Sequence, residues 1–223
     1  MKYLSRDCEP PLTRRHKAAR LAFAKTYANT DWRNVVFSDE TKLEFGDHGR
    51  KSWCCRGARK KRIVRAHPPS CQFWAAVGWR RSTSLVPRSV MNAGVYIATL
   101  RRHLPAVLNI RRGMMFQQDN APSHTAKVVK SYLKSAKVKA LEWPALSPDL
   151  NLIENLWHQL KVRVTRRVAK LNDVFPPKEA LIGIAQRQWT ALVSNPAVLQ
   201  PLFDSMPDRL HEVIQNRGGF THY

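Results

Sequence analysis

The stretch "FQQDNAPSHTA", residues 116–126, places an acid where a short apolar run gives way to turn residues. The apolar residues just before Gln117 predict a buried strand over 114–118, and Asn120 and the residues after it predict a turn into a helix over 123–136. Asp119 falls at this strand-to-helix junction. An Asp there fits either a helix cap or a catalytic carboxylate, and the stretch alone leaves both interpretations open.

Outward from this stretch, the chain predicts a run of strands followed by alternating helices and strands. That order is typical of a mixed sheet with helices on its faces, an α/β fold. The expected strands are 35–38, 42–45, 71–79, 83–88, 114–118 and 137–143. The expected helices are 13–28 with Thr13 as its cap, 94–113 with a kink at Pro105, 123–136, 148–168, 177–193 and 204–217.

The segment "WPALSPDLNLIENLWHQLKVRV", residues 143–164, predicts an amphipathic helix that starts near Ser147 and Pro148. Glu154 lies at the edge of the apolar stripe, where it can lean toward the strand ends. Asn151 and Glu154 also have the spacing of a capping box, which would give Glu154 a purely local role. Both alternatives remain open at this point. The apolar stripe comprises Ile153, Leu156, Trp157, Leu160 and Val164.

The formal net charge is +22, and the basic residues are unevenly spread. Between Asp47 and Asp119 the chain has no acid, while residues 48–118 hold 15 Lys and Arg. The densest part is "GRKSWCCRGARKKRIVR", residues 49–65, where apolar residues interrupt the charges. Such a charge distribution favours a polyanion partner, and nucleic acid fits best. An anionic membrane surface would prefer a basic amphipathic helix, and this stretch has no helical periodicity.

Other classes of protein are disfavoured. No apolar run is long enough to span a membrane, and the N-terminus lacks the apolar region of a secretory signal. The four cysteines form no CxxC pair, which disfavours a disulfide framework and a zinc finger and favours free thiols.

Three blocks, "FSDETKLEFG" (37–46), "FQQDNAPSHTA" (116–126) and "EWPALSPDLNLIENLWHQLK" (142–161), closely resemble those of the Tc/mariner superfamily of DDE transposases. The 34 residues between Asp119 and Glu154 are typical of the Tc-type branch. The resemblance implies an RNase H-like fold with a mixed five-stranded sheet. It also implies that Asp39, Asp119 and Glu154 form the catalytic, metal-binding triad for two Mg²⁺ or Mn²⁺ ions.

Weaker site candidates surround this triad. Asn120, His124 and Asn155 flank the acids and are candidates for orienting water or phosphate, although each also fits a turn or helix surface. His158 lies one helical turn after Glu154 and is a candidate hydrogen-bond partner for it. Candidate DNA-binding residues in the basic stretch are Lys60, Lys61, Arg62 and Arg65.

The resemblance implies a function and a domain layout. We expect a connector and helix over 1–30, a catalytic core over 31–170 with a basic clamp-like loop at 46–70, and a helical extension over 171–223. The implied reaction is cut-and-paste transposition of double-stranded DNA, which takes place in the nucleus. The resemblance also implies that two copies of the chain form a homodimer through the clamp-like loop. The N-terminal helix-turn-helix modules of the family are not recognisable here, which suggests a truncated copy. A non-catalytic DNA-binding remnant and a metal-dependent nuclease are the alternatives.

Overall fold

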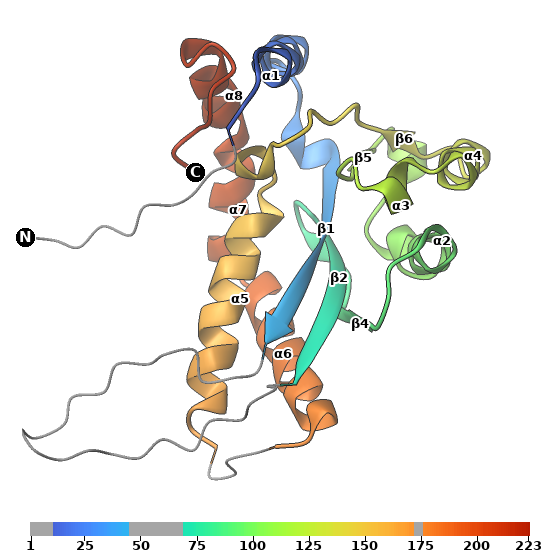
Figure 1. Ribbon diagram of the computed structural model, residues 1–223, viewed down its shortest axis with the longest axis vertical. Coiled ribbons are helices and arrows are strands. Elements are labelled where there is room, and N and C mark those ends of the chain that lie inside the picture. The colour runs from blue at the N-terminus through green and yellow to red at the C-terminus, as the bar shows by residue number, and fades with distance from the viewer. Residues whose placement is uncertain (1–10, 45–68, 172–175) are drawn as a thin grey trace, which may run out of the picture.

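A single mixed sheet forms the centre of the computed structural model, which describes residues 11–44, 69–171 and 176–223 (Figure 1). Its strand order is β3-β2-β1-β5-β6, and β4 pairs with another part of β2. β1 runs antiparallel to β2 and parallel to β5, which is in turn parallel to β6. The strands are β1 (Val35–Glu44), β2 (Ser70–Gly78), β3 (Arg81–Ser82), β4 (Val86–Arg88), β5 (Met115–Gln117) and β6 (Lys139–Ala140).

Helices cover both faces of this sheet. Figure 1 shows α2, α3 and α4 on one side of β1 and β2, and α5, α6 and α7 on the other. The helices are α1 (Arg14–Thr26), α2 (Ala93–His103), α3 (Pro122–Thr125), α4 (Lys127–Ser135), α5 (Ile153–Val168), α6 (Lys178–Val193), α7 (Pro196–Asp204) and α8 (Met206–Gln215). Short 3-10 helices are η1 (Trp32–Asn34), η2 (Leu104–Ala106), η3 (Ile110–Arg112) and η4 (Pro148–Leu150).

The alternation of side chains along β1 divides the core in two. Val35, Phe37 and Leu43 belong to the cluster beneath α5 and α6, whereas Val36 belongs to the cluster beneath α2 and α4. Cys71, a free and buried thiol, joins the first cluster. Because both faces of β1 are buried along its first half, any polar side chain there must find a partner.

The mixed sheet flanked by helices confirms the expected fold class, but the strand count differs. The sheet has six strands in the described residues, not five. The additional strand is β3 (Arg81–Ser82), which lies in the expected turn before 83–88, and only Val86–Arg88 of that expected strand is extended in the sheet, as β4. The two expected runs 35–38 and 42–45 are one continuous strand, β1, since it pairs with β2 all the way from Phe37 to Glu44.

The expected helices need four corrections. The helix expected to start near Ser147 and Pro148 begins only at Ile153, because Pro148–Leu150 form the separate 3-10 helix η4. The helix expected over 94–113 is not kinked at Pro105 but ends at His103, and Pro105 lies in η2. Proline has no N–H to continue the helical ladder, so a 3-10 turn replaces it. The helix expected over 123–136 divides at Ala126, whose ψ of 141° is extended, into α3 and α4. The helix expected over 204–217 is preceded by α7, which was not predicted.

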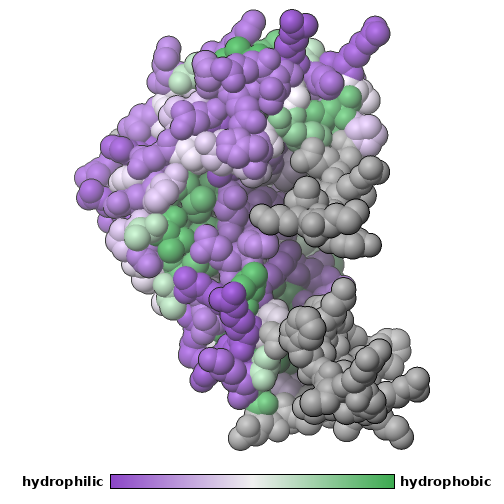
Figure 2. Space-filling view, turned by 90° about the vertical axis from the view of Figure 1, so that its left-hand side faces the viewer, coloured by the Kyte–Doolittle hydropathy of each residue, from purple (hydrophilic) through white to green (hydrophobic). Residues whose placement is uncertain are grey.

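The surface is mainly polar where Figure 2 shows it. The face drawn there, at the left of Figure 1, has mostly hydrophilic residues with small hydrophobic areas between them. Within the described ranges, no helix is both long enough and apolar enough to cross a membrane.

Candidate active site

Asp39 lies in the middle of β1, on the face that packs against α5. Successive side chains of a strand point to opposite faces, so Asp39 follows Val35 and Phe37 on the face beneath α5. The indole Nε1–H of Trp157, on α5, donates a hydrogen bond to Asp39 Oδ2 (3.0 Å). The carboxylate is therefore held between the sheet and the helix.

Asp119 comes just after β5, at the same position along the paired strands as Asp39 on β1. β1 and β5 are parallel, with Phe37 paired to Gln117, and each acid comes two residues after its member of that pair. Ser38 joins the two strands at this point, because its N–H donates to Gln117 Oε1 (3.1 Å) and its hydroxyl to the Gln117 carbonyl (2.9 Å). The strand register thus brings the two acids to one edge of the sheet.

Asp119 also caps the turn that leads into α3. Its Oδ1 accepts hydrogen bonds from the Ala121 N–H (3.0 Å) and from His124 Nδ1 (2.5 Å). The side chain is nevertheless about half exposed, at 48%. The sequence left open a helix cap and a catalytic carboxylate. Asp119 is not the helix cap, because the N-cap of α3 is Ala121, and the Asp119 carboxylate remains accessible beside the turn that it holds.

Glu154 is the second residue of α5, and it does not form the capping box with Asn151. The N-cap of α5 is Leu152, and Asn151 Oδ1 accepts from the Ile153 N–H (3.4 Å) instead. The Asn151 amide points toward the sheet, where it donates to the Ser38 carbonyl (3.5 Å). The predicted apolar stripe of α5 is confirmed, because all five of its residues are buried. Glu154, at the edge of that stripe, is exposed.

One cavity of about 350 Å³ has Asp39, Asp119 and Glu154 in its wall. The remaining wall comes from Asn120, Asn151 and residues 143–148. Asp39 and Glu154 lie close enough to share a hydrogen bond when one of them is protonated. Among the described residues, no three His, Cys, Asp or Glu side chains already converge around a single point as metal ligands do. The cavity therefore collects three carboxylates without closing them around one position.

Like charges in this cavity disturb the ionisation of its acids. Burial, followed by repulsion from Glu154 and Glu40, raises the pKa of Asp39 to about 8. Partial burial and the charge of Asp119 also raise the pKa of Glu154, although its hydrogen bond with Asp39 and the Lys161 ammonium act in the opposite direction. The Asp39–Glu154 pair therefore retains a proton near neutral pH.

His124 provides a positive charge beside these acids. Burial opposes its protonation, but hydrogen bonds and charge from Asp119 and Glu40 raise its pKa to about 9. Its Nε2 lies 3.2 Å from Glu40 Oε1, and its ring stacks on Tyr96 with centroids 4.0 Å apart. Burial also opposes ionisation of Asp119, yet the hydrogen bonds from His124 and Ala121 outweigh it and lower the pKa of Asp119.

The four weaker candidates divide into two pairs. Asn120 lines the cavity and donates to the Trp143 carbonyl (2.8 Å), and His124 contacts Asp119 directly. Asn155, contrary to the prediction, faces away, because its Oδ1 accepts from Arg209 Nη2 (2.8 Å). His158 is exposed and does not line the cavity, and no hydrogen bond joins it to Glu154 in the described part of the chain. Successive residues of an α-helix are about 100° apart around its axis, so the side chain of Asn155 points away from the cavity that Glu154 faces.

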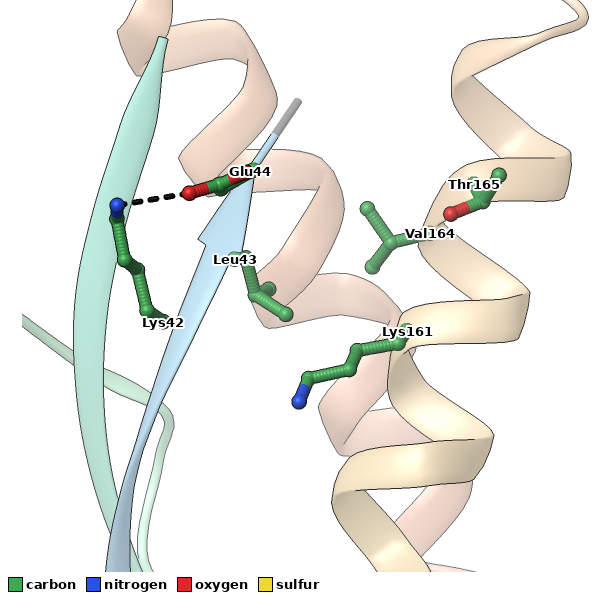
Figure 3. Close-up of a pocket in the computed structure, with 6 residues that line it drawn as sticks. All are labelled: Lys42, Leu43, Glu44, Lys161, Val164 and Thr165. Carbon is green, nitrogen blue, oxygen red and sulfur yellow. Dashed lines mark hydrogen bonds and ion pairs between the residues drawn. The ribbon is translucent and has the colours of Figure 1, made fainter. Parts of the chain in front are cut away.

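The predicted DNA-binding residues Lys60, Lys61, Arg62 and Arg65 lie outside the described residues, as does most of the clamp-like loop 46–70. Their role in DNA binding and the homodimer expected through this loop stay predictions. A smaller cavity of about 270 Å³ lies between the end of β1 and α5, and Figure 3 shows Lys161 pointing into it beside Leu43. Lys161 thus extends the polar edge of α5 beyond Glu154.

Known proteins resemble this chain in sequence and in fold. Residues 34–174 match the family described as DDE superfamily endonuclease. The chain is 35% identical to the Tc3 transposase of Caenorhabditis elegans over 96% of its length and spans 65% of that relative. It is 31% identical to the Tc1 transposase of the same organism, again over 96% of the chain, and spans 81% of that relative.

The chain belongs to the DDE superfamily endonucleases. Within them it is a transposase catalytic domain of the Tc/mariner type. Solved structures show the same RNase H-like fold. A Mos1 transposase paired-end complex with the left transposon end has a TM-score of 0.78 at 19% identity, over 99% of this chain and 67% of that one. The catalytic domain of Mos1 mariner transposase has a TM-score of 0.70 at 17% identity, over 96% of this chain and 100% of that one.

The transposase domain contains site residues that sequence reasoning did not identify. Trp157 was assigned to the apolar stripe, yet its indole N–H also donates a hydrogen bond to Asp39. Glu40 was quoted only as part of a motif, yet strand alternation turns it to the opposite face of β1, where it meets His124. Tyr96 supports His124 and donates to Gln118 Oε1 (2.8 Å). The alternation of Asp39 and Glu40 along the strand was a signal available in the sequence, whereas the position of Tyr96 was not.

Proposed function

We propose that Asp39, Asp119 and Glu154 bind two Mg²⁺ or Mn²⁺ ions and that this site hydrolyses phosphodiester bonds and transfers strands in double-stranded DNA. In the full reaction, hydrolysis at transposon ends frees a 3′-hydroxyl, which then attacks target DNA. The observation that carries the proposal is the single cavity that collects carboxylates from β1, from the end of β5 and from α5.

The residues present suit a hard divalent cation. Mg²⁺ prefers oxygen ligands and binds through few carboxylates while keeping several waters. Burial, followed by repulsion from neighbouring carboxylates, raises the pKa values of Asp39 and Glu154, and a bound cation would stabilise both ionised forms. Two such ions, held by the three carboxylates, would supply an activated water and would stabilise the leaving oxygen in an in-line displacement.

The protein's own groups orient these carboxylates. Trp157 holds Asp39 Oδ2 by a hydrogen bond, which directs the other oxygen, Oδ1, away from the indole. His124 and the Ala121 N–H hold Asp119 Oδ1 and favour its ionised form. Because these partners are fixed by the packed core, the acids enter the reaction already oriented.

Charge and related proteins support DNA as the substrate class. A net charge of +22 favours a polyanion. Solved neighbours of the same fold include a Mos1 mariner paired-end complex with Mn and another with Mg. DNA as substrate makes the nucleus the expected site of action. A binding remnant without catalysis is not favoured, since all three acids face the cavity.

Plasmid nicking tests the proposal. Purified protein is incubated with supercoiled DNA in Mg²⁺ or Mn²⁺, and relaxed and linear products are measured over time. We expect metal-dependent nicking by the wild type and a loss of at least about 100-fold in Asp119→Asn and Glu154→Gln, since each removes a metal ligand.

Glu179→Gln is the matched control. Glu179 is an exposed acid in the first turn of α6, outside the cavity, and its variant should nick at the wild-type rate. Equal nicking by Glu154→Gln and wild type, or nicking that persists in EDTA, would refute the proposed role of the triad.

A further inference from the structure

Arg20, on α1, is buried and fully hydrogen-bonded. It is 0% exposed, and a guanidinium has five N–H donors in a fixed planar arrangement. Two of them form a bidentate pair with Asp149, at 2.8 Å to Oδ1 and 2.6 Å to Oδ2. The other three donate to the carbonyls of Leu146 (3.3 Å), Gly218 (3.1 Å) and Gly219 (3.0 Å). Every donor of Arg20 therefore has one acceptor.

Arg209, on α8, is the second buried arginine of this network. It is 1% exposed, and its Nη1 donates to the Asp149 carbonyl (2.6 Å). Its Nη2 donates to Asn155 Oδ1 (2.8 Å) and its Nε to Ser205 Oγ (3.0 Å). Figure 1 shows α1 and α8, the helices that carry these two arginines, side by side at one end of the molecule. Two helices from opposite ends of the chain thus hold η4 and the first turn of α5.

The segment held in this way forms one wall of the catalytic cavity. Pro148, Asn151 and Glu154 face the cavity, while Asp149 and Asn155 face the arginines. Asn155 directly follows Glu154, and Asp149 lies in the 3-10 turn just before the helix. The arginines therefore fix the chain on both sides of Glu154 without entering the cavity.

We propose that Arg20 and Arg209 are positioning residues that hold the Glu154 carboxylate in place for metal binding. This inference rests on the proposed function, because it assigns Glu154 to the metal site. A buried ion pair contributes little net stability compared with apolar side chains of similar size, since both charges lose their water. A bidentate arginine–carboxylate pair does fix geometry. Partners behind a metal ligand govern the affinity of the site in the same way.

Two variants separate positioning from stability. Arg20→Lys keeps the positive charge but removes the planar set of donors, and Asn155→Leu removes the acceptor next to Glu154 at similar size. Leu192→Ala, in a buried position of α6 outside the cavity, supplies a variant with lowered stability and an intact network. The dissociation constant for Mn²⁺ is measured by calorimetry below the thermal midpoint of each variant.

We expect the dissociation constant to rise by roughly 10–100-fold in Arg20→Lys and in Asn155→Leu, the usual effect of losing a partner behind a metal ligand. Leu192→Ala should bind Mn²⁺ like the wild type although it melts earlier. Wild-type affinity in Asn155→Leu, or equal losses of affinity in all three variants, would overturn the inference. Failure of Asn155→Leu to fold would overturn it too, because the contact would then maintain the whole fold. A wild type that binds no Mn²⁺ would contradict the proposed function itself.

Discussion

Asp39 is partly buried beside the Glu154 carboxylate, and burial, followed by repulsion from that charge, raises the pKa of Asp39 to about 8. The pKa of an unfolded Asp is about 3.9. Between these two values the folded chain binds the proton more tightly than the unfolded chain does. Without metal, Asp39 therefore costs stability progressively as the pH rises from about 4 to about 8, and its cost is absent below that window.

Asp39→Asn should remove this cost. Relative to metal-free wild type, the free energy of unfolding of the variant should increase by at least about 1.4 kcal/mol between pH 5 and pH 8, the equivalent of one pKa unit. Urea unfolding at several pH values in EDTA provides the measurement. A difference between the two proteins that is constant with pH would show that Asp39 titrates normally.

Trp157→Phe isolates a single hydrogen bond at the same residue. The change removes the N–H that holds Asp39 Oδ2 but keeps an aromatic ring against Trp189, whose centroid is 4.9 Å from that of Trp157. A hydrogen bond to a charged group contributes about 1.5–3 kcal/mol. The pKa of Asp39, followed by carboxyl ¹³C NMR, should therefore rise by about one unit or more. An unaltered titration curve would remove Trp157 from the site.

At the scale of helices and strands, the backbone after α8 packs closely against α1 at a glycine. Gly218 has a φ of +87°, and a Cβ there would lie 2.0 Å from the Lys17 carbonyl oxygen. Gly113 also has a positive φ, +68°, but a Cβ there would meet no atom within 4 Å. Both glycines thus have a left-handed backbone conformation, but only Gly113 has space for a Cβ atom.

Substitution of both glycines separates the two effects. Gly113→Ala should lower the free energy of unfolding by about 1–2 kcal/mol, the cost of a left-handed L-residue. Gly218→Ala should cost about 1–3 kcal/mol more, because the methyl group must displace the α1 backbone. Urea denaturation measures both. Equal losses in the two variants would show that the close approach of Gly218 to Lys17 does not exist.

The sequence could predict those elements that depend on residues close together in the chain. The stripe of α5 and the cap at Thr13 follow from residues a few positions apart, and both are confirmed. The Arg20–Asp149 pair joins residues 129 positions apart, so no local pattern reveals it. The helix α7 was not predicted, although Pro196 occupies its first turn, where proline is tolerated.

Across the whole molecule, parallel pairing of β1 and β5 explains why acids 80 residues apart in the chain come together. The resemblance of the motif blocks implied that Asp39, Asp119 and Glu154 share one site, and all three line one cavity. The motif blocks could not predict the hydrogen bonds that hold each acid, because Trp157 and His124 act from elements whose packing is decided by the complete core.

The net charge of +22 predicts salt-dependent binding to DNA. Each phosphate neutralised releases counterions, so log affinity should fall against log salt with a slope of about −0.9 per contact. Fluorescence anisotropy on a duplex gives this slope, and changing Lys60, Lys61, Arg62 and Arg65 together to Ala should flatten it by about 1–4. An unchanged slope would exclude these four residues from the DNA path.

The central claim is that Asp119, together with Asp39 and Glu154, binds the divalent ions, and thermal unfolding with and without Mn²⁺ tests it most directly. An ion that binds only the folded state at 100 times its dissociation constant adds about 2.7 kcal/mol. For a chain of 223 residues this corresponds to a rise in the thermal midpoint of roughly 5–10 °C. The account predicts that rise in wild type and in Glu179→Gln, and its near absence in Asp119→Asn. A full rise in Asp119→Asn would contradict the account, because the stabilising ions would then bind elsewhere.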